Sequence, residues 1–549
     1  FIGKLVLTYA DGTTQEVPTD TSWQSYTDGP YVETCNQNGE TYDARKEVPG
    51  WANAGFDTTD WLTTKVATKQ TINTKVDTTK VALVAQPEDP ARVIEELPVK
   101  FLAKTGEDTY VYDIGQNISG ILRINVKGEA GTTLKLRHGE MVYKDTNVLY
   151  TANLREAKAT DYYTLKGDVN GETYEPSFTF HGFRYFEVSG LGYQPDDADI
   201  TALVVHSELD RTGWVTTNND LVNQLFSNVI WGQRDNYLSI PTDCPQRDER
   251  LGWTGDATTF SRTGSMNFDI DAFYTKFMRN VENARNKTTG AIYDIAPREG
   301  HAVGEGNHGW GDVAVVAPWT MFTAYADTGI LEENWTMMTE WIKYYVNKAG
   351  DDLLLPADSY GDWLAVETSP KEVTATSYFA YSTSLMAKMA TALGKTEEAK
   401  YYNNLFEQIR TAYVDAYVNT TTGVIEGNTQ TIYVMALYFN LIEDSALRQK
   451  VAENLVSRIE AANWHLSTGF LGCELLLPAL TEAGYTEIAY QLLLNTTYPS
   501  WLYPVVNGAT TIWERWNSYI AETGTFGDVG MNSFNHYSYG SVTEWFYQY

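Results

Sequence analysis

The spacing of apolar residues changes once along this chain, and that change restricts the fold to strands followed by helices. Before about residue 207, apolar and polar residues alternate in short runs such as 121–126 and 185–188, which is typical of half-buried strands. Farther along, apolar residues recur every three or four positions, so that Ile270, Phe273 and Phe277 share one helical face. The sequence therefore predicts a strand-rich part followed by an all-helical part.

A chain of 549 residues exceeds what one hydrophobic core usually supports, so several domains are expected. We predict a β-rich domain over 1–97, a β-sandwich over 98–207 and a helical domain over 208–549. Twelve helices in antiparallel pairs favour an (α/α)6 barrel. An open array of stacked helical pairs is the alternative, although the sequence shows no fixed repeat. The predicted helices are 218–238, 256–266, 270–286, 310–328, 332–349, 374–393, 396–418, 430–441, 444–461, 468–483, 485–495 and 538–549.

Composition excludes several functions. The net charge of −31 opposes binding to nucleic acids and to anionic membranes, both of which attract basic proteins. The sequence has no apolar run long enough for membrane insertion. Cys35, Cys244 and Cys473 are too few and too far apart for a disulfide framework or a zinc site. An uncharged substrate fits this composition best. The sequence leaves open whether the chain forms a homodimer.

The first residues begin directly in a strand pattern, without Met or a signal peptide. We therefore expect the natural N-terminus to lie upstream of Phe1. The compartment, cytoplasmic or secreted, stays open.

One turn-rich stretch, 241–256, gathers groups that bind polyols and transfer protons. Carboxylates accept hydrogen bonds from hydroxyls, arginines donate in a fixed fork, and an indole face covers the C–H side of a sugar ring. Crowding should raise the pKa of at least one carboxyl, as a general acid requires, and Glu249 is our candidate. A purely structural ion-pair network is the alternative. The residues concerned are Asp243, Arg247, Asp248, Glu249, Arg250, Trp253 and Asp256.

A second candidate acid, Glu514, lies far downstream between two tryptophans in TIWERW. Aromatic flanks desolvate and position a carboxylate. Paired with Glu249, Glu514 would complete the two carboxylates of a glycosidase, whereas core packing with a surface ion pair is the alternative. Loop strings with Trp, Asp and Gly, and one late histidine, are further candidates for sugar contact. They contain Trp310, Asp312, Trp363 and His536.

The stretch DCPQRDERLGWTGD from Asp243 to Asp256 strongly resembles the corresponding motif of bacterial α-L-rhamnosidases of glycoside hydrolase family 78. The similarity covers essentially the whole chain. The motifs that extend it upstream are YDIGQNISG from Tyr112, NLREAKATD from Asn153, FTFHGFRY from Phe178, NGETYDAR from Asn38 and GWANAGFD from Gly50.

This resemblance implies a jelly-roll-like N-terminal module, a β-sandwich and an (α/α)6 barrel. It implies hydrolysis of terminal non-reducing α-L-rhamnose from glycosides or oligosaccharides, with inversion and without a metal or organic cofactor. By the same resemblance Glu249 is the general acid and Glu514 the general base. The implied rhamnose-binding residues are Asp243, Arg247, Trp253, Asp256, Trp310, Trp363 and His536.

Two other functions remain open at this stage. One is an (α/α)6 hydrolase for another hexose or deoxyhexose, and the other is a catalytically silent rhamnose-binding protein. Family members generally continue past the barrel into a C-terminal β-sandwich, whereas this chain stops at Tyr549. We therefore expect either a fragment or an exposed apolar patch formed by Trp545, Phe546 and Tyr547.

Overall fold

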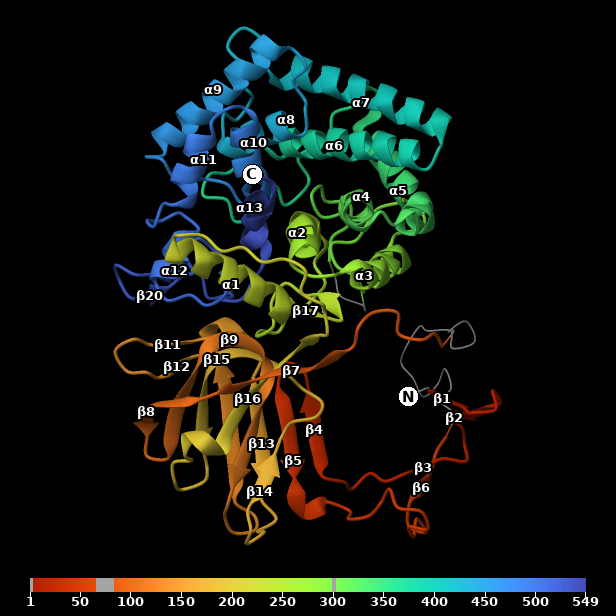
Figure 1. Cartoon of the computed structure of the whole chain (residues 1–549), viewed down its shortest axis with the longest axis vertical. Coiled ribbons are helices and arrows are strands. Elements are labelled where there is room, and N and C mark those ends of the chain that lie inside the picture. The colour runs from red at the N-terminus through yellow and green to blue at the C-terminus, as the bar shows by residue number, and fades with distance from the viewer. Residues whose placement is uncertain (1–2, 66–82, 299–302) are drawn as a thin grey trace.

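A strand-rich region precedes a helical region in the computed structural model, which describes residues 3–65, 83–298 and 303–549 (Figure 1). This order confirms the prediction drawn from the change in apolar spacing. None of the helices in these residues combines the length and the apolarity that crossing a membrane requires.

Ten strands of the first region form one sheet in the order β4-β5-β13-β10-β15-β9-β16-β7, with β8 and β14 also paired to β9. All pairs are antiparallel except β5 with β13. The long strand β9 changes neighbours along its length, so the sheet curls around one apolar core. The strands are β4 (Tyr31–Cys35), β5 (Gly39–Asp43), β7 (Ala91–Pro98), β8 (Lys100–Gly106), β9 (Thr109–Val126), β10 (Thr133–Gly139), β13 (Thr160–Thr164), β14 (Glu172–Tyr174), β15 (His181–Ser189) and β16 (Ile200–Ser207).

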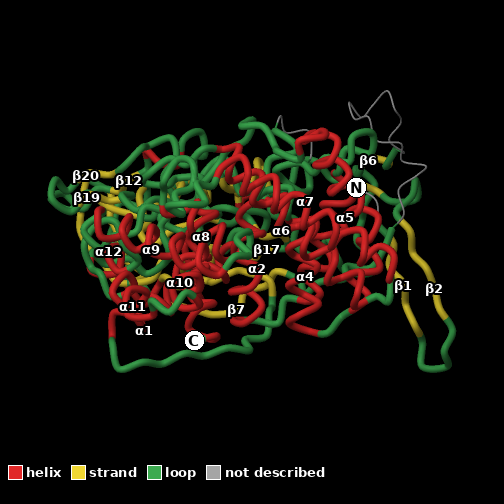
Figure 2. Tube along the Cα trace, turned by 90° about the horizontal axis from the view of Figure 1, so that it is seen from above, coloured by secondary structure: helices red, strands yellow, loops and turns green. Residues whose placement is uncertain are grey.

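Strands on both sides of the predicted boundary at residue 97 take part in this sheet. β4 and β5 precede the boundary and pair with the sheet through β13, while β7 crosses it. The division between residues 97 and 98 stays a prediction. A separate exposed hairpin, β1 (Lys4–Thr8) with β2 (Thr14–Pro18), projects from the edge of the molecule (Figure 2).

Six helices of the second region form a closed inner ring. α2 contacts α4, and the contacts continue through α6, α8 and α10 to the 3-10 helix η6, which returns to α2. Helices such as α4, α8 and α10 are apolar on nearly all sides, as helices surrounded by other helices must be. The inner helices are α2 (Thr254–Asn267), α4 (Val313–Tyr325), α6 (Lys371–Ala392), α8 (Gln430–Tyr438), α10 (Phe470–Glu482) and η6 (Ser538–Thr543).

Outer helices alternate with the inner ones along the chain and pack against them, which gives the predicted (α/α)6 arrangement. Each of the twelve predicted segments contains a helix. The prediction of one α-helix over 538–549 is corrected, because this segment begins as the 3-10 helix η6 and ends as the α-helix α13 (Glu544–Gln548). The short helix α12 (Leu502–Val506) was not predicted. The outer helices are α1 (Asp220–Asn236), α3 (Asp271–Ala284), α5 (Thr328–Ala349), α7 (Thr396–Tyr417), α9 (Ser445–Ala461) and α11 (Thr486–Leu493).

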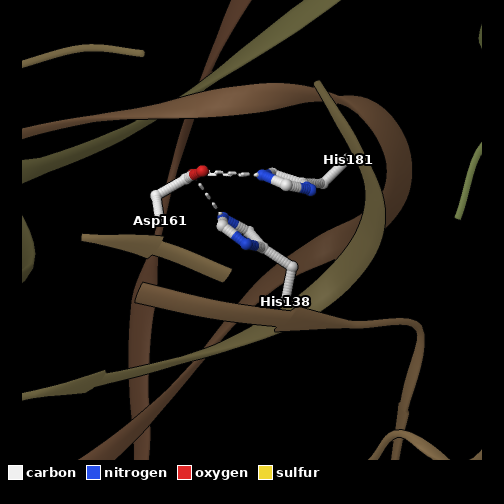
Figure 3. A group of neighbouring side chains, drawn as sticks. All are labelled: His138, Asp161 and His181. Carbon is white, nitrogen blue, oxygen red and sulfur yellow. Dashed lines mark hydrogen bonds and ion pairs between the residues drawn. The ribbon is translucent and has the colours of Figure 1, made fainter. Parts of the chain in front are cut away.

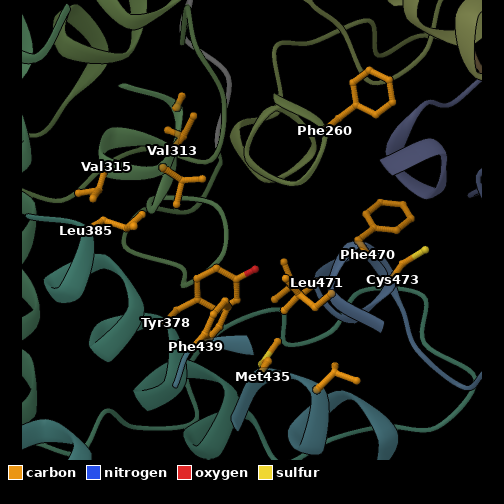
Figure 4. Close-up of a cluster of buried hydrophobic side chains, with 14 of the residues drawn as sticks. Phe260, Val313, Val315, Tyr378, Leu385, Met435, Phe439, Phe470, Leu471 and Cys473 are labelled. Atoms are coloured by element: carbon orange, nitrogen blue, oxygen red, sulfur yellow. The ribbon is translucent and has the colours of Figure 1, made fainter. Parts of the chain in front are cut away.

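The middle of the ring is filled by apolar side chains from successive inner helices (Figure 4). Phe260, Val313, Tyr378, Met435 and Leu471 each come from a different inner helix and are almost completely buried. Their burial removes a large apolar area from water, which is the main favourable contribution to folding. The ring is therefore a packed core whose chemistry must lie at its ends.

The expected exposed patch at the end of the chain is wrong for Trp545, whose side chain is only 3% exposed. Helix α13 packs against α2, α10 and η6. The indole Nε1–H of Trp545 donates to Thr481 Oγ1 at 2.9 Å, and the hydroxyl of Tyr547 donates to Asn267 Oδ1 at 3.0 Å. Phe546 and Tyr547 are half-buried. The last helix thus covers its apolar residues against the ring itself.

Replacing Trp545 by Ala should lower the free energy of unfolding by about 3–5 kcal/mol, because it opens a cavity between α13 and the ring. Chemical denaturation of the purified chain measures this change. Trp214→Ala is the matched control, since that indole is 66% exposed and should cost about 0.5 kcal/mol or less. Equal losses in the two variants would contradict the packing of α13.

Candidate active site

A pocket of about 540 Å³ lies where the loops before five inner helices converge. Its residues lie at the start of α2 and α10 or in the segments that lead into α2, α4, α6 and η6, so one end of the ring carries the site. The pocket brings together nine of the ten predicted site residues from segments far apart in the sequence. The lining residues are Asp243, Arg247, Glu249, Trp253, Asp256, Trp310, Tyr360, Trp363, Phe470, Glu514, Met531 and His536.

The guanidinium of Arg247 lies at the centre of the charged side of the pocket, with its side chain only 1% exposed. Its Nη1–H and Nη2–H donate to the two oxygens of Glu514 at 2.7 and 3.2 Å. Its Nε–H donates to Glu249 Oε2 at 2.9 Å, and Nη2 also lies 3.3 Å from Asp243 Oδ2. One buried cation thus holds three carboxylates in fixed positions, which offsets the cost of burying each charge.

Two of these carboxylates have opposite pKa shifts. Burial, reinforced by the nearby Glu249, raises the pKa of Asp243. Burial alone would also raise the pKa of Glu514, but Arg247, His536 and a hydrogen bond from the Ser533 N–H outweigh it and lower that pKa. Glu514 is therefore ionised near neutral pH.

Glu249 sits among three donors. Its Oε2 accepts from Arg247 Nε and lies 3.2 Å from Nη2 of Arg155, a residue of the strand-rich region. Its Oε1 accepts from the indole Nε1–H of Trp253 at 2.8 Å. These contacts fix the rotamer of Glu249 in the wall of the pocket.

His536 and Asp256 form a second charged pair beside Glu514. His536 Nε2 lies 3.1 Å from Asp256 Oδ1, which also accepts from the Ser538 hydroxyl at 3.0 Å. Burial lowers the pKa of His536, but Asp256 and then Glu514 outweigh that effect and the net pKa is raised. The imidazole therefore favours its cationic form, which supports the anionic form of Glu514.

Aromatic rings form the opposite wall of the pocket. Tyr360 makes edge-to-face contacts with Trp253, Trp310 and Trp363, with ring centroids 6.4, 4.9 and 5.8 Å apart. The Tyr360 hydroxyl donates to the buried Asp294 at 2.8 Å, which fixes the ring. Phe470 and Met531 carry no separate signal in the sequence, whereas Tyr360 shares its short string with Trp363.

The placement of Asp312 corrects the prediction that it contacts substrate. Its side chain is fully buried outside the pocket. Its carboxylate accepts from the Gly309 N–H, the Trp341 indole, the Tyr345 hydroxyl and the Ser382 hydroxyl. Because these four donors occupy its lone pairs, Asp312 fastens the start of α4 to α5 and α6.

The strand-rich region supports the loop segments that carry Glu514 and His536. Glu140, buried at the end of β10, accepts from the Phe534 N–H at 3.1 Å and from Asn153 Nδ2 at 2.9 Å. Asn153 also donates to the Asn532 carbonyl, and Asn117 donates to Glu140 Oε1. Burial raises the pKa of Glu140 to about 7. A polar network from the sheet therefore holds the backbone next to Glu514.

Two groups of potential metal ligands occur in the described residues. The first, Asp243, Cys244 and Glu249, already surrounds the guanidinium of Arg247, which contacts both carboxylates. A metal ion there would have to displace a buried arginine, so these residues do not fit a metal.

The second group, His138, Asp161 and His181, lies buried within the sheet (Figure 3). His181 Nε2 is 3.1 Å from both oxygens of Asp161, and His138 Nδ1 is 2.9 Å from the Ala159 carbonyl. The two imidazoles stack with centroids 4.1 Å apart and planes inclined by 17°. Since nearly parallel rings direct their nitrogen lone pairs side by side, they do not converge on one ion, and a hydrogen-bonded core cluster describes the group better.

Three family models match consecutive parts of the chain. The bacterial alpha-L-rhamnosidase 6 hairpin glycosidase domain matches residues 210–549, which is more than half of the chain. The bacterial alpha-L-rhamnosidase concanavalin-like domain matches residues 103–206, and the alpha-L-rhamnosidase N-terminal domain matches residues 1–95. This chain belongs to the bacterial α-L-rhamnosidase family. The family indicated by the 243–256 motif is thereby confirmed.

Named relatives agree with this family. An α-L-rhamnosidase of Streptomyces avermitilis is 46% identical over 547 residues, which cover 100% of this chain and 51% of the relative. The crystal structure of that organism's α-L-rhamnosidase complexed with L-rhamnose superposes with a TM-score of 0.93 at 46% identity, with the same coverage. The α-L-rhamnosidase structure from Dictyoglumus thermophilum has a TM-score of 0.91 at 34% identity and covers 100% of this chain and 60% of its own. The chain thus spans about half the length of its Streptomyces relative.

The buried carboxyl of Glu140 should make stability depend on pH in a way that one substitution removes. Its pKa rises from an ordinary 4.5 to about 7 on folding, so its contribution to stability is fully present below pH 4.5 and is lost as the pH rises through about 7. Glu140→Gln does not titrate. The unfolding free energy of this variant minus that of the wild type should therefore increase between these pH values and then level off.

Denaturant titrations at a series of pH values measure this difference. Glu129→Gln, on an exposed turn, is the control for the substitution itself and is measured at the same pH values. A constant difference for Glu140→Gln would show that folding does not raise the pKa of Glu140.

Proposed function

We propose that this chain carries the catalytic site of an inverting α-L-rhamnosidase, which hydrolyses terminal non-reducing α-L-rhamnose from glycosides or oligosaccharides. The observation that carries the proposal is one pocket in which two separate carboxylates, Glu249 and Glu514, face an aromatic wall. The Streptomyces avermitilis protein, whose structure holds L-rhamnose, is 46% identical to this chain over 547 residues, which cover 100% of this chain. These two facts support the substrate and the site together.

In this proposal Glu514 is the general base and Glu249 the general acid. The lowered pKa of Glu514 suits a group that must accept a proton from water. The guanidinium of Arg247 stands between the two carboxylates and bonds to both, so they are held apart by its width. Inverting glycosidases keep their two carboxyl groups about 6.5–9.5 Å apart, so that a water fits between the base and the sugar.

The other lining groups suit a deoxyhexose. Asp243, Asp256 and His536 offer charged partners for ring hydroxyls, and Trp253, Trp310 and Trp363 offer flat apolar faces for C–H groups. Rhamnose carries a methyl group where other hexoses carry a hydroxymethyl group. Phe470 and Met531 supply apolar surface that a methyl group can occupy without leaving a hydroxyl unpaired.

Hydrolysis of 4-nitrophenyl α-L-rhamnoside, followed by proton NMR of the first-formed sugar, tests the proposal. We expect turnover with β-L-rhamnose appearing first. The matching α-L-mannoside, which differs only by the hydroxyl on C6, should be a much poorer substrate. Preference for another hexoside would favour a different (α/α)6 hydrolase, and rhamnose binding without turnover would favour a silent binding protein.

Glu249→Gln should lower kcat for an unactivated rhamnoside by about 100-fold or more, because the leaving group then departs without a proton. Rhamnose binding, measured by calorimetry, should be retained. Glu398→Gln on the exposed face of α7 is the control and should leave both quantities unchanged. Near-normal turnover by Glu249→Gln would remove this residue from the role of acid.

Asp243→Asn should raise KM by about tenfold, because the sugar loses one charge-assisted hydrogen bond. Steady-state kinetics on 4-nitrophenyl α-L-rhamnoside measure the change. Asp312→Asn is the comparison, since this residue lies outside the pocket. Those molecules of the Asp312→Asn variant that fold should have the wild-type KM. An unchanged KM in Asp243→Asn would place Asp243 outside the rhamnose subsite.

A further inference from the structure

Arg155 is a residue of the strand-rich region that reaches the proposed general acid. It follows the short 3-10 helix η3 (Ala152–Leu154), and its Nη2 lies 3.2 Å from Glu249 Oε2. Its Nε–H donates to Asp248 Oδ1, so one guanidinium holds two neighbouring carboxylates of the 241–256 loop. Its Nη1–H also approaches the Gly530 carbonyl at 3.4 Å. The side chain is 27% exposed, which places it at the edge of the site.

The backbone at Arg155 is unusual for a residue with a side chain. Its φ is 56° and its ψ is −111°, a region that residues other than glycine rarely adopt. Such a conformation persists only where surrounding contacts fix it. Here the next residue contributes, because the Glu156 N–H approaches Asp248 Oδ2 at 3.4 Å. The contacts that hold this backbone are the same ones that aim the guanidinium at the 248–249 pair.

The two oxygens of Glu249 are not equivalent. Oε2 faces two guanidinium groups, Nε of Arg247 at 2.9 Å and Nη2 of Arg155 at 3.2 Å. A carboxyl oxygen has two lone pairs, so both on Oε2 are engaged. Among the residues that the structure describes, Oε1 accepts only from the Trp253 indole at 2.8 Å, which leaves it one lone pair. A proton on Glu249 therefore has its place on Oε1.

We propose that Arg155 is a positioning residue for the acid step: together with Arg247 it occupies Oε2 of Glu249, so that the transferable proton sits on Oε1 beside Trp253. This inference rests on the proposed role of Glu249 as general acid. Protonated Oε1 gives its proton to the glycosidic oxygen as the bond to the anomeric carbon breaks, and Glu249 is left as a carboxylate between two arginines. Loss of Arg155 would free Oε2 to take the proton in an unproductive position.

The other groups around Glu249 do not replace Arg155. Asp243 is a carboxyl group already bonded to Arg247, Cys244 is fully buried and donates to Asp243, and Glu514 is also bonded to Arg247. His536 is engaged by Asp256. The charged and titratable groups around this carboxyl are Asp243, Cys244, Arg247 and Asp248 on its own loop and Arg155 from the strand-rich region. Glu514 and His536, from the segments before η6, line the same pocket.

The test compares two rhamnosides that differ in their need for the acid. Methyl α-L-rhamnoside has a poor leaving group that must be protonated, whereas 2,4-dinitrophenyl α-L-rhamnoside leaves without a proton. Arg155→Gln should lower kcat for the methyl glycoside by about tenfold or more and change kcat for the dinitrophenyl glycoside by less than about threefold. Arg137→Gln is the matched control, because that guanidinium pairs with Glu187 elsewhere in the sheet. It should change neither rate.

Each result decides a separate point. Equal losses on both substrates, or no loss on either, would overturn the role of Arg155 while leaving the proposed function intact. A wild-type chain that hydrolyses neither rhamnoside would overturn the proposed function, and the role of Arg155 with it. If Arg155→Gln does not fold, Arg155→Lys carries the test. Lysine keeps the charge without the two-pronged fork, so the loss should again be confined to the methyl glycoside.

Discussion

The site depends on one buried guanidinium, that of Arg247. Without it, Asp243, Glu249 and Glu514 would be three acids in one poorly hydrated pocket, and their mutual repulsion would favour protonation of at least one. With it, Glu514 is held as an anion although it is almost fully buried. Arg247 therefore determines which carboxylate is ready to accept a proton, and it also fixes the distance between the two proposed catalytic groups.

The fold follows from the sequence because periodicity is a local property. Alternation over 121–126 and three-to-four spacing over 270–281 each reflect which side of one element is buried, and both were predictable. The error at Asp312 has a different origin. Its string of Gly, Trp and Asp has the same composition as a sugar site, but four donors from α5, α6 and the turn before α4 occupy its carboxylate. Only the packing of those helices distinguishes the two cases.

The family motif predicted Glu249 and Glu514 as partners, but it did not predict what supports them. Arg155 and Glu140 belong to the strand-rich region, and no spacing in the sequence links them to residues so far along the chain. Their roles depend on how the sheet docks against the open end of the ring. The strand-rich region is thus part of the framework of the proposed active site. A helical region cut at residue 208 would lack the partners of the Phe534 backbone and of the Glu249 carboxyl.

The closure of the inner ring has a consequence for synthesis on the ribosome. Arg247 and Glu514 are 267 residues apart, and η6, which closes the ring between α10 and α2, is its last member in chain order. A nascent chain folds from its N-terminal side, so five apolar inner helices and the arginine emerge before their final partners exist. The growing chain must therefore keep these surfaces from aggregating, and the proposed site can form only after η6 has emerged from the ribosome.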